Sequence, residues 1–98
     1  MVYRSRFSEP MVDDLFNAIL SLENQEDCYR FFEDLCTIGE IKAMAGRWRV
    51  AKMLTENRTY SDIIAETGVS TATISRVKKC LHYGADGYSR ILAARDRK

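Results

Sequence analysis

Residues 59–81, Thr-Tyr-Ser-Asp-Ile-Ile-Ala-Glu-Thr-Gly-Val-Ser-Thr-Ala-Thr-Ile-Ser-Arg-Val-Lys-Lys-Cys-Leu, decide the fold, because they are typical of two short helices joined by a tight turn. Gly68 can adopt the positive φ that ends the first helix. Ser70 can then cap the second helix with its hydroxyl. The sequence therefore predicts a helix-turn-helix at about residues 60–82.

The second of these helices has two contrasting sides. An apolar stripe near helical spacing faces inward and consists of Val69, Ile74, Val77 and Leu81. The opposite side is short, polar and basic, with Ala72, Ser75, Arg76 and Lys79, and with Thr71 at the helix start. Small side chains permit close approach and hydroxyls can bond to base edges, so this side favours a helix that enters the DNA major groove end-first. The alternative is a helical hairpin that exposes ordinary polar residues.

Length and composition set the broad class. A chain of 98 residues predicts a single domain over 1–98, small enough that a partner subunit would help to bury its core. The hydrophobic fraction of 46% is ordinary for a globular protein and excludes a disordered chain. No apolar run approaches the roughly 20 residues that span a bilayer, and the N-terminus lacks the apolar core of a signal peptide. We therefore expect a cytoplasmic protein with no membrane partner.

The cysteines and the single histidine give no sign of a metal or catalytic site. Cys28, Cys36 and Cys80 are odd in number and form no Cys-x-x-Cys pair, which favours free thiols over disulfides or zinc. His82 has no second histidine or close cysteine pair to share a metal with. An active site needs a nucleophile or base with an orienting partner, and Cys80 has no evident activator beyond Arg76. We therefore expect no enzyme activity, no metal and no required cofactor.

The net charge of +1 hides a strong split along the chain. Residues 1–36 carry three basic and eight acidic groups, a net charge of −5, whereas residues 37–98 carry twelve basic and six acidic groups, a net charge of +6. The basic part contains the predicted helix-turn-helix, as a protein that neutralises phosphates requires.

The rest of the chain predicts helices only, because no strand-like alternation persists. Ser8 can cap a first helix that has Pro10 in its opening turn, and Asn24 can cap a second. Thr37 and Glu40 have the spacing of a capping box and predict a third helix that runs to about Glu56. The third helix is apolar on two sides, which is typical of a helix clasped between neighbours. With a sixth helix after residues 86–87, the predicted fold is all-α with about six helices.

Two segments carry a resemblance to a known family: Thr37…Glu40…Arg47-Trp-Arg49, and Gly-Val-Ser-Thr-Ala-Thr-Ile-Ser-Arg at residues 68–76. Together with chain length and helix order, they make the chain similar to the Trp-repressor-like family, most closely its small YerC/YecD branch, over nearly its whole length. The second segment alone is shared by many helix-turn-helix regulators, so the upstream Arg47 supplies the family-specific part. The resemblance implies an all-helical, intertwined homodimer whose two reading heads address half-sites about one DNA turn apart.

The resemblance also implies a place for a small-molecule corepressor. In the Trp repressor two arginines sandwich the tryptophan indole, while a threonine and one arginine hold its carboxylate. Arg47 and Arg76 match these arginines and Thr37 matches the threonine, while Cys80 stands where the repressor has a polar serine. Val77 replaces the glycine that gives the ring room, so these two changes argue against tryptophan. Another small ligand, no ligand, and phosphate contacts or ion pairs by the two arginines are the alternatives.

The functional hypothesis is a homodimeric, sequence-specific transcription regulator of the nucleoid, expected to be a repressor, that binds double-stranded DNA. The residues predicted to face base edges are Thr71, Ala72 and Ser75. The residues predicted to hold phosphates are Arg58, Ser70 through the backbone amides beside it, Lys78 and Lys79. The alternative is a helical protein-interaction module that keeps the helix-turn-helix shape without reading DNA and uses its acidic first two helices as a contact face.

Overall fold

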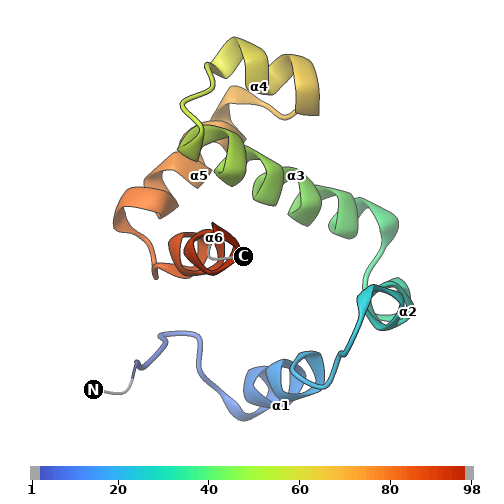
Figure 1. Cartoon of the computed structure of the whole chain (residues 1–98). Helices are drawn as coiled ribbons and strands as arrows, with labels where there is room; N and C mark the ends of the chain where they lie inside the picture. Colours follow the sequence, from blue (N-terminus) through green and yellow to red (C-terminus); the bar gives the residue numbers. More distant parts are fainter. Residues whose placement is uncertain (1–2, 97–98) are drawn as a thin grey trace. The chain divides into compact units, whose positions relative to one another are not determined.

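The computed structural model describes residues 3–96, and this range contains six helices and no strand (Figure 1). The helices are α1 (Pro10–Ile19), α2 (Gln25–Leu35), α3 (Ile38–Thr55), α4 (Tyr60–Thr67), α5 (Thr71–Tyr83) and α6 (Gly87–Asp96). The all-α prediction is therefore confirmed. The chain divides into two compact units, one ending at Thr37 and the other beginning at Ile38. The single domain over residues 1–98 stays a prediction.

The start of α1 differs by one residue from the predicted start. Glu9 is the N-cap, and the Ser8 hydroxyl instead donates a hydrogen bond to the Asp13 carboxylate at 3.3 Å. The prediction that Ser8 caps this helix was wrong. Pro10 has no N–H and a fixed φ that suits the first helical position, so the cap falls on the residue directly before it.

The helix α2 begins as predicted, with the Asn24 side chain accepting a hydrogen bond from the Asp27 backbone N–H at 2.8 Å. Neither α1 nor α2 contains a buried residue. Large apolar side chains at the two ends of α1 face solvent, with Met11 80% and Leu20 81% exposed. The N-terminal unit therefore has apolar faces but no core of its own within one chain.

The helix α3 begins and ends within one residue of its predicted bounds, and a sharp turn follows it. Asn57 takes a left-handed conformation with φ of 61°. Its N–H donates to the carbonyl of Leu54, and the N–H of Arg58 donates to the carbonyl of Met53, both at 3.1 Å. This pattern is a Schellman motif, in which the last helical carbonyls find partners in the turn.

The predicted helix-turn-helix is confirmed at α4 and α5. The Thr59 hydroxyl accepts from the Asp62 N–H at 3.1 Å and caps α4. Gly68 ends α4 in the left-handed region with φ of 73°. The Ser70 hydroxyl accepts from the Thr73 N–H at 3.1 Å and caps α5.

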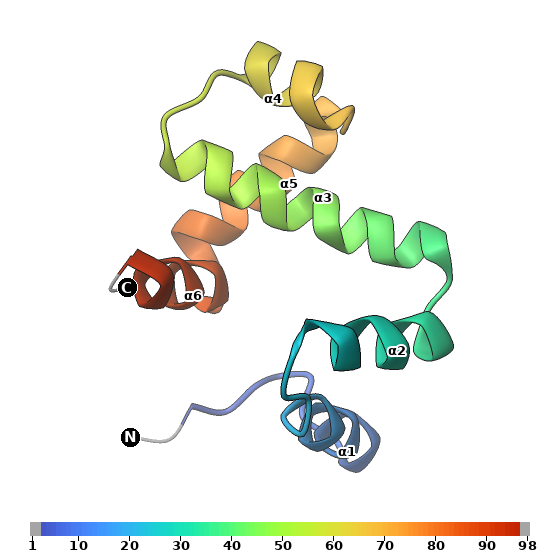
Figure 2. The ribbon, with the colours of Figure 1, turned by 45° about the vertical axis from the view of Figure 1, so that its right-hand side comes forward.

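The core of the second unit lies where α5 crosses α3 and α4 packs against both (Figure 2). Its fully buried residues are Val50, Ala51, Met53, Ile63, Ile74 and Val77. The predicted inward stripe of α5 is confirmed, because two of its residues are in this core and the other two, Val69 and Leu81, pack against it. Burying each large aliphatic side chain contributes roughly 1.5–3 kcal/mol of transfer free energy, which holds α5 on α3.

Within the part of the chain that the structure describes, we find no helix with the length and apolarity needed to cross a membrane.

Candidate nucleic-acid interface

The outward side of α5 is the side exposed to solvent, and it includes the first residue of the helix. Thr71, Ala72 and Ser75, the three residues predicted to face base edges, are all exposed. Ile74 and Val77 on the opposite side are buried, with at most 1% of their surface exposed. The helix is therefore anchored by its apolar side and presents small polar side chains near its N-terminal end.

The capped start of α5 is also suited to an anion. The Ser70 hydroxyl accepts from the backbone N–H of Thr73, and the backbone N–H groups ahead of it have no partner within the helix. The first turn of α5 contains no acidic residue. Helix N-termini carry partial positive charge, so the backbone amides beside Ser70 can receive a phosphate oxygen.

Two lysines extend the basic character of α5. Lys79 is exposed one turn after Ser75, so the two share a side of the helix. Lys78 lies toward α4, with its Nζ 5.9 Å from the centroid of the Tyr60 ring. Lys78 and Arg58 also line one hollow of about 540 Å³ between the α3–α4 turn and α5. The predicted phosphate contacts thus occupy both the outward side and the α4 flank of α5.

Arg58 is held by acidic side chains of α4. Its Nε lies 3.6 Å from Asp62 Oδ2, and its Nη2 lies 3.8 Å from Glu66 Oε1. Glu66 also accepts a 2.7 Å hydrogen bond from the Nε of Arg49 on α3. Sequence reasoning missed these ion pairs. The i,i+4 spacing of Arg58 and Asp62 could have indicated one of them, whereas Arg49 and Glu66 are 17 residues apart and share no local signal.

The predicted ligand pocket stays a prediction, because its members belong to two compact units, with Thr37 in one and Arg47, Arg76 and Cys80 in the other. A cavity of about 530 Å³ includes Cys80, but neither Arg47 nor Arg76 is among its lining residues. Arg47 is half-buried on α3, and Arg76 is exposed on α5. Thr37 ends the other compact unit. The predicted set therefore remains a prediction taken from the family resemblance, and Cys80 is the member that lines this cavity.

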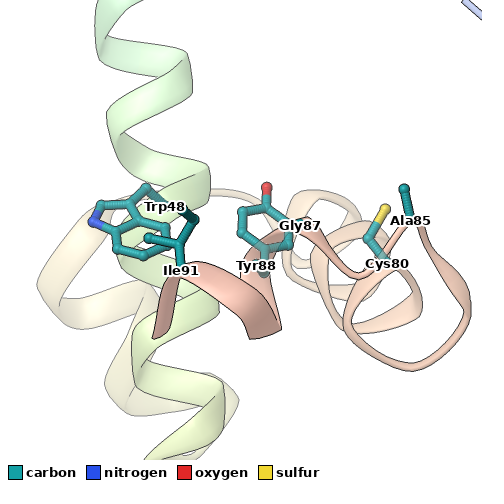
Figure 3. Close-up of a pocket in the computed structure, with 6 residues that line it drawn as sticks. All are labelled: Trp48, Cys80, Ala85, Gly87, Tyr88 and Ile91. Atoms are coloured by element: carbon teal, nitrogen blue, oxygen red, sulfur yellow. The ribbon is translucent and has the colours of Figure 1, made fainter. Parts of the chain in front are cut away.

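The cavity beside Cys80 is lined almost wholly by apolar groups. Figure 3 shows Trp48 and Ile91 at one end, Cys80 and Ala85 at the other, and Tyr88 between them. The rings of Trp48 and Tyr88 stack with centroids 6.3 Å apart and planes 23° apart. Among the described residues that line this cavity none is charged, so none of them would pair with the carboxylate of an amino acid.

The described residues contain no group of three or more histidine, cysteine, aspartate or glutamate side chains that could hold a metal ion.

Comparison with known proteins places this geometry in a family. The family model described as Trp repressor protein matches residues 11–96. The chain is 62% identical over 81 residues to YerC, an uncharacterized protein of Bacillus subtilis (strain 168), covering 83% of this chain and 78% of that protein. The match to the family model spans α1 through α6, and so covers both compact units.

Two crystal structures share the fold. A TrpR-like protein from Eubacterium eligens ATCC 27750 matches with a TM-score of 0.90 at 52% identity, covering 93% of this chain and 94% of that one. A protein from Staphylococcus aureus described as a proposed Trp repressor matches with a TM-score of 0.89 at 48% identity, covering 95% and 93% of the two chains. With its six helices, its helix-turn-helix and these matches, the chain belongs to the Trp repressor family.

Proposed function

We propose that this protein is a sequence-specific DNA-binding transcription regulator, a repressor that acts as a homodimer through α4 and α5. The observation that carries the proposal is the arrangement of α5. Small polar side chains lie on its outward side at the capped start of the helix, and the apolar residues on its other side are buried in the core. Membership of the Trp repressor family supports the same conclusion and favours a regulator over an enzyme.

In this proposal the start of α5 enters the major groove. The hydroxyls of Thr71 and Ser75 donate to or accept from base edges, and the Ala72 methyl meets a thymine methyl. None of these contacts is strongly selective by itself. Sequence preference therefore also depends on bridging water and on the shape of the DNA.

Backbone phosphates are held around this reading surface. Lys79 contacts one strand from the outward side of α5, while Lys78 and Arg58 act from the flank that faces α4. The amides beside Ser70 receive a further phosphate. Arg58 can do so because its contacts with Asp62 and Glu66 are long and involve no hydrogen bond, so that a phosphate oxygen can replace them.

A second copy of the chain covers the apolar faces of the N-terminal unit in the proposed dimer. Met11 and Leu20 are about four-fifths exposed in one chain, and α1 and α2 bury no residue, so a single copy leaves this surface in water. Two reading heads related by a two-fold axis would contact half-sites about 34–36 Å apart. Sedimentation equilibrium should give twice the 11.3 kDa of one chain, and a strictly monomeric protein would refute this part of the proposal.

DNA binding in this proposal requires no small molecule, metal or cofactor. Tryptophan is not favoured as a corepressor, because Val77 is buried in the core at the place where the Trp repressor has glycine. Binding of a different small ligand by Arg47 and Arg76 is a separate hypothesis that follows from the family resemblance. The proposed place of action is the nucleoid in the cytoplasm.

The test is a titration of duplex DNA over a range of salt concentrations with the native protein and Lys79→Ala. Removing one phosphate contact lowers affinity for all sequences and reduces the slope of log K against log salt by about one unit. Lys42→Ala, which removes the same charge from the exposed start of α3, is the matched control and should leave the slope unchanged. An unchanged slope in Lys79→Ala would remove Lys79 from the interface. Absence of binding to any duplex at low salt would refute DNA binding and favour the protein-interaction module.

A further inference from the structure

Glu66, in the last turn of α4, contacts two arginines that lie outside its own helix. Its Oε2 accepts a 2.7 Å hydrogen bond from Nε of Arg49 on α3. Its Oε1 lies 3.8 Å from Nη2 of Arg58, in the turn between α3 and α4. One carboxylate therefore links three consecutive segments of the chain: α3, the turn and α4.

The helix α4 is otherwise attached to the core through Tyr60 and Ile63, both in its first half. It is eight residues long and contains one buried residue, Ile63. Glu66 follows Ile63 by three positions, so the two side chains lie on neighbouring sides of the helix and both face α3. Ile63 fixes the first half of α4, and the ion pair fixes its end. That end precedes Gly68 and the turn that leads into α5 (Figure 2).

We propose that Glu66 is a positioning residue for DNA reading: its ion pair with Arg49 sets the angle of α4 on α3 and so aims the start of α5. This inference rests on the proposed function. Glu66 contacts no base or phosphate in this account. In this account Arg49 acts on α4 through its hydrogen bond to the carboxylate.

The exposure of the pair sets the size of the expected effect. The side chains of Arg49 and Glu66 are 53% and 36% exposed, and ion pairs in such surroundings contribute little to global stability. Loss of the pair should therefore leave the protein folded. It should widen the range of α4 orientations and reduce the preference for the specific sequence by about three- to fivefold.

The test compares Glu66→Gln with Asp62→Asn, a matched control on the same helix. Each substitution removes one negative charge beside Arg58, but only Glu66 is bonded to Arg49. Fluorescence anisotropy measures binding to a duplex selected from random sequences with the native protein, and to a scrambled duplex. Both variants should bind the scrambled duplex more tightly and to a similar degree, because each loses one repulsive charge. Only Glu66→Gln should lower the ratio of selected to scrambled affinity.

The ratio separates positioning from folding, because partial unfolding lowers binding to both duplexes equally and leaves their ratio unchanged. Hydrogen exchange of the free protein gives a readout that needs no DNA. Amides of residues 60–70 should exchange faster in Glu66→Gln than in Asp62→Asn. If the native protein prefers no sequence, the proposed function fails. The exchange comparison still tests whether the Glu66–Arg49 ion pair holds α4 on α3. Equal amide exchange and equal affinity ratios in the two variants would show that the Glu66–Arg49 ion pair does not hold α4. Faster exchange in Glu66→Gln with an unchanged affinity ratio would overturn its role in positioning α5.

Discussion

The left-handed backbone at Gly68 gives a direct test of the helix-turn-helix geometry. Gly68 ends α4 with φ of 73° and ψ of 6°. A Cβ added at this position would meet no atom within 4 Å. Gly68→Ala therefore introduces no steric overlap with other side chains, and its effect on stability arises from the backbone conformation alone.

The magnitude follows from two opposing terms. The left-handed conformation costs an L-residue about 1–2 kcal/mol. Alanine also restricts the unfolded chain, which stabilises the folded state by about 0.4–1 kcal/mol. The net loss in the free energy of unfolding should be about 1 kcal/mol. For a chain of this size that loss lowers the melting temperature by about 4–8 °C.

Gly87→Ala is the matched control, because a Cβ there also meets no atom within 4 Å and Gly87 has no positive φ. It should leave the melting temperature unchanged or raise it slightly. Gly68→Asn should recover part of the loss, since asparagine tolerates the left-handed region. Thermal unfolding followed by circular dichroism measures all three variants at one protein concentration, because the stability of a self-associating chain depends on concentration. Equal melting temperatures for Gly68→Ala and Gly87→Ala would refute the requirement for a left-handed residue.

Two further substitutions test the anchor and the reading surface of the helix-turn-helix. Ile74→Ala should lower the free energy of unfolding by about 2–5 kcal/mol in urea titrations, because it empties a fully buried position. Ile91→Ala, at a position 55% exposed, should lose far less, and similar losses would contradict the assigned core. Thr71→Val keeps the side-chain shape and removes the hydroxyl, so it should change preference at one base pair by roughly 1–3 kcal/mol. Selection from random duplexes that returns one motif for both proteins would exclude Thr71 from base contact.

The local elements were predictable where a single residue determines them. Gly68 ends one helix through its backbone freedom and Ser70 caps the next through its side chain, and each acts as expected in the structure. Ser8 is not the cap, because the fixed φ of Pro10 suits the first helical position and places the cap at Glu9. The left-handed Asn57 was not predicted, since asparagine is common in many kinds of turn and its sequence neighbours do not specify this one.

The candidate site was predictable only as far as helical periodicity reaches. Alternation of Ile74 and Val77 with Thr71 and Ser75 is enough to separate the buried side of α5 from its outward side. The link from Arg49 to Glu66 depends on how α4 folds back on α3, which no local pattern encodes. The ligand pocket follows from the family resemblance and not from periodicity, and it stays a prediction because its members belong to two compact units.

Charge and burial divide the chain at the same place, and this coincidence bears on how the proposed dimer would work. Residues 38–98 contain every fully buried side chain of the described range and the excess of basic groups. The residues before position 38 carry an excess of acidic groups, and no residue of α1 or α2 is buried. A unit with its own core can hold α5 rigidly for DNA, whereas a unit with exposed apolar faces gains stability chiefly by packing on another chain. In the proposed dimer, acidic charge on the assembling unit also disfavours its approach to DNA phosphates, so that like-charge repulsion leaves the basic unit as the surface that binds the duplex.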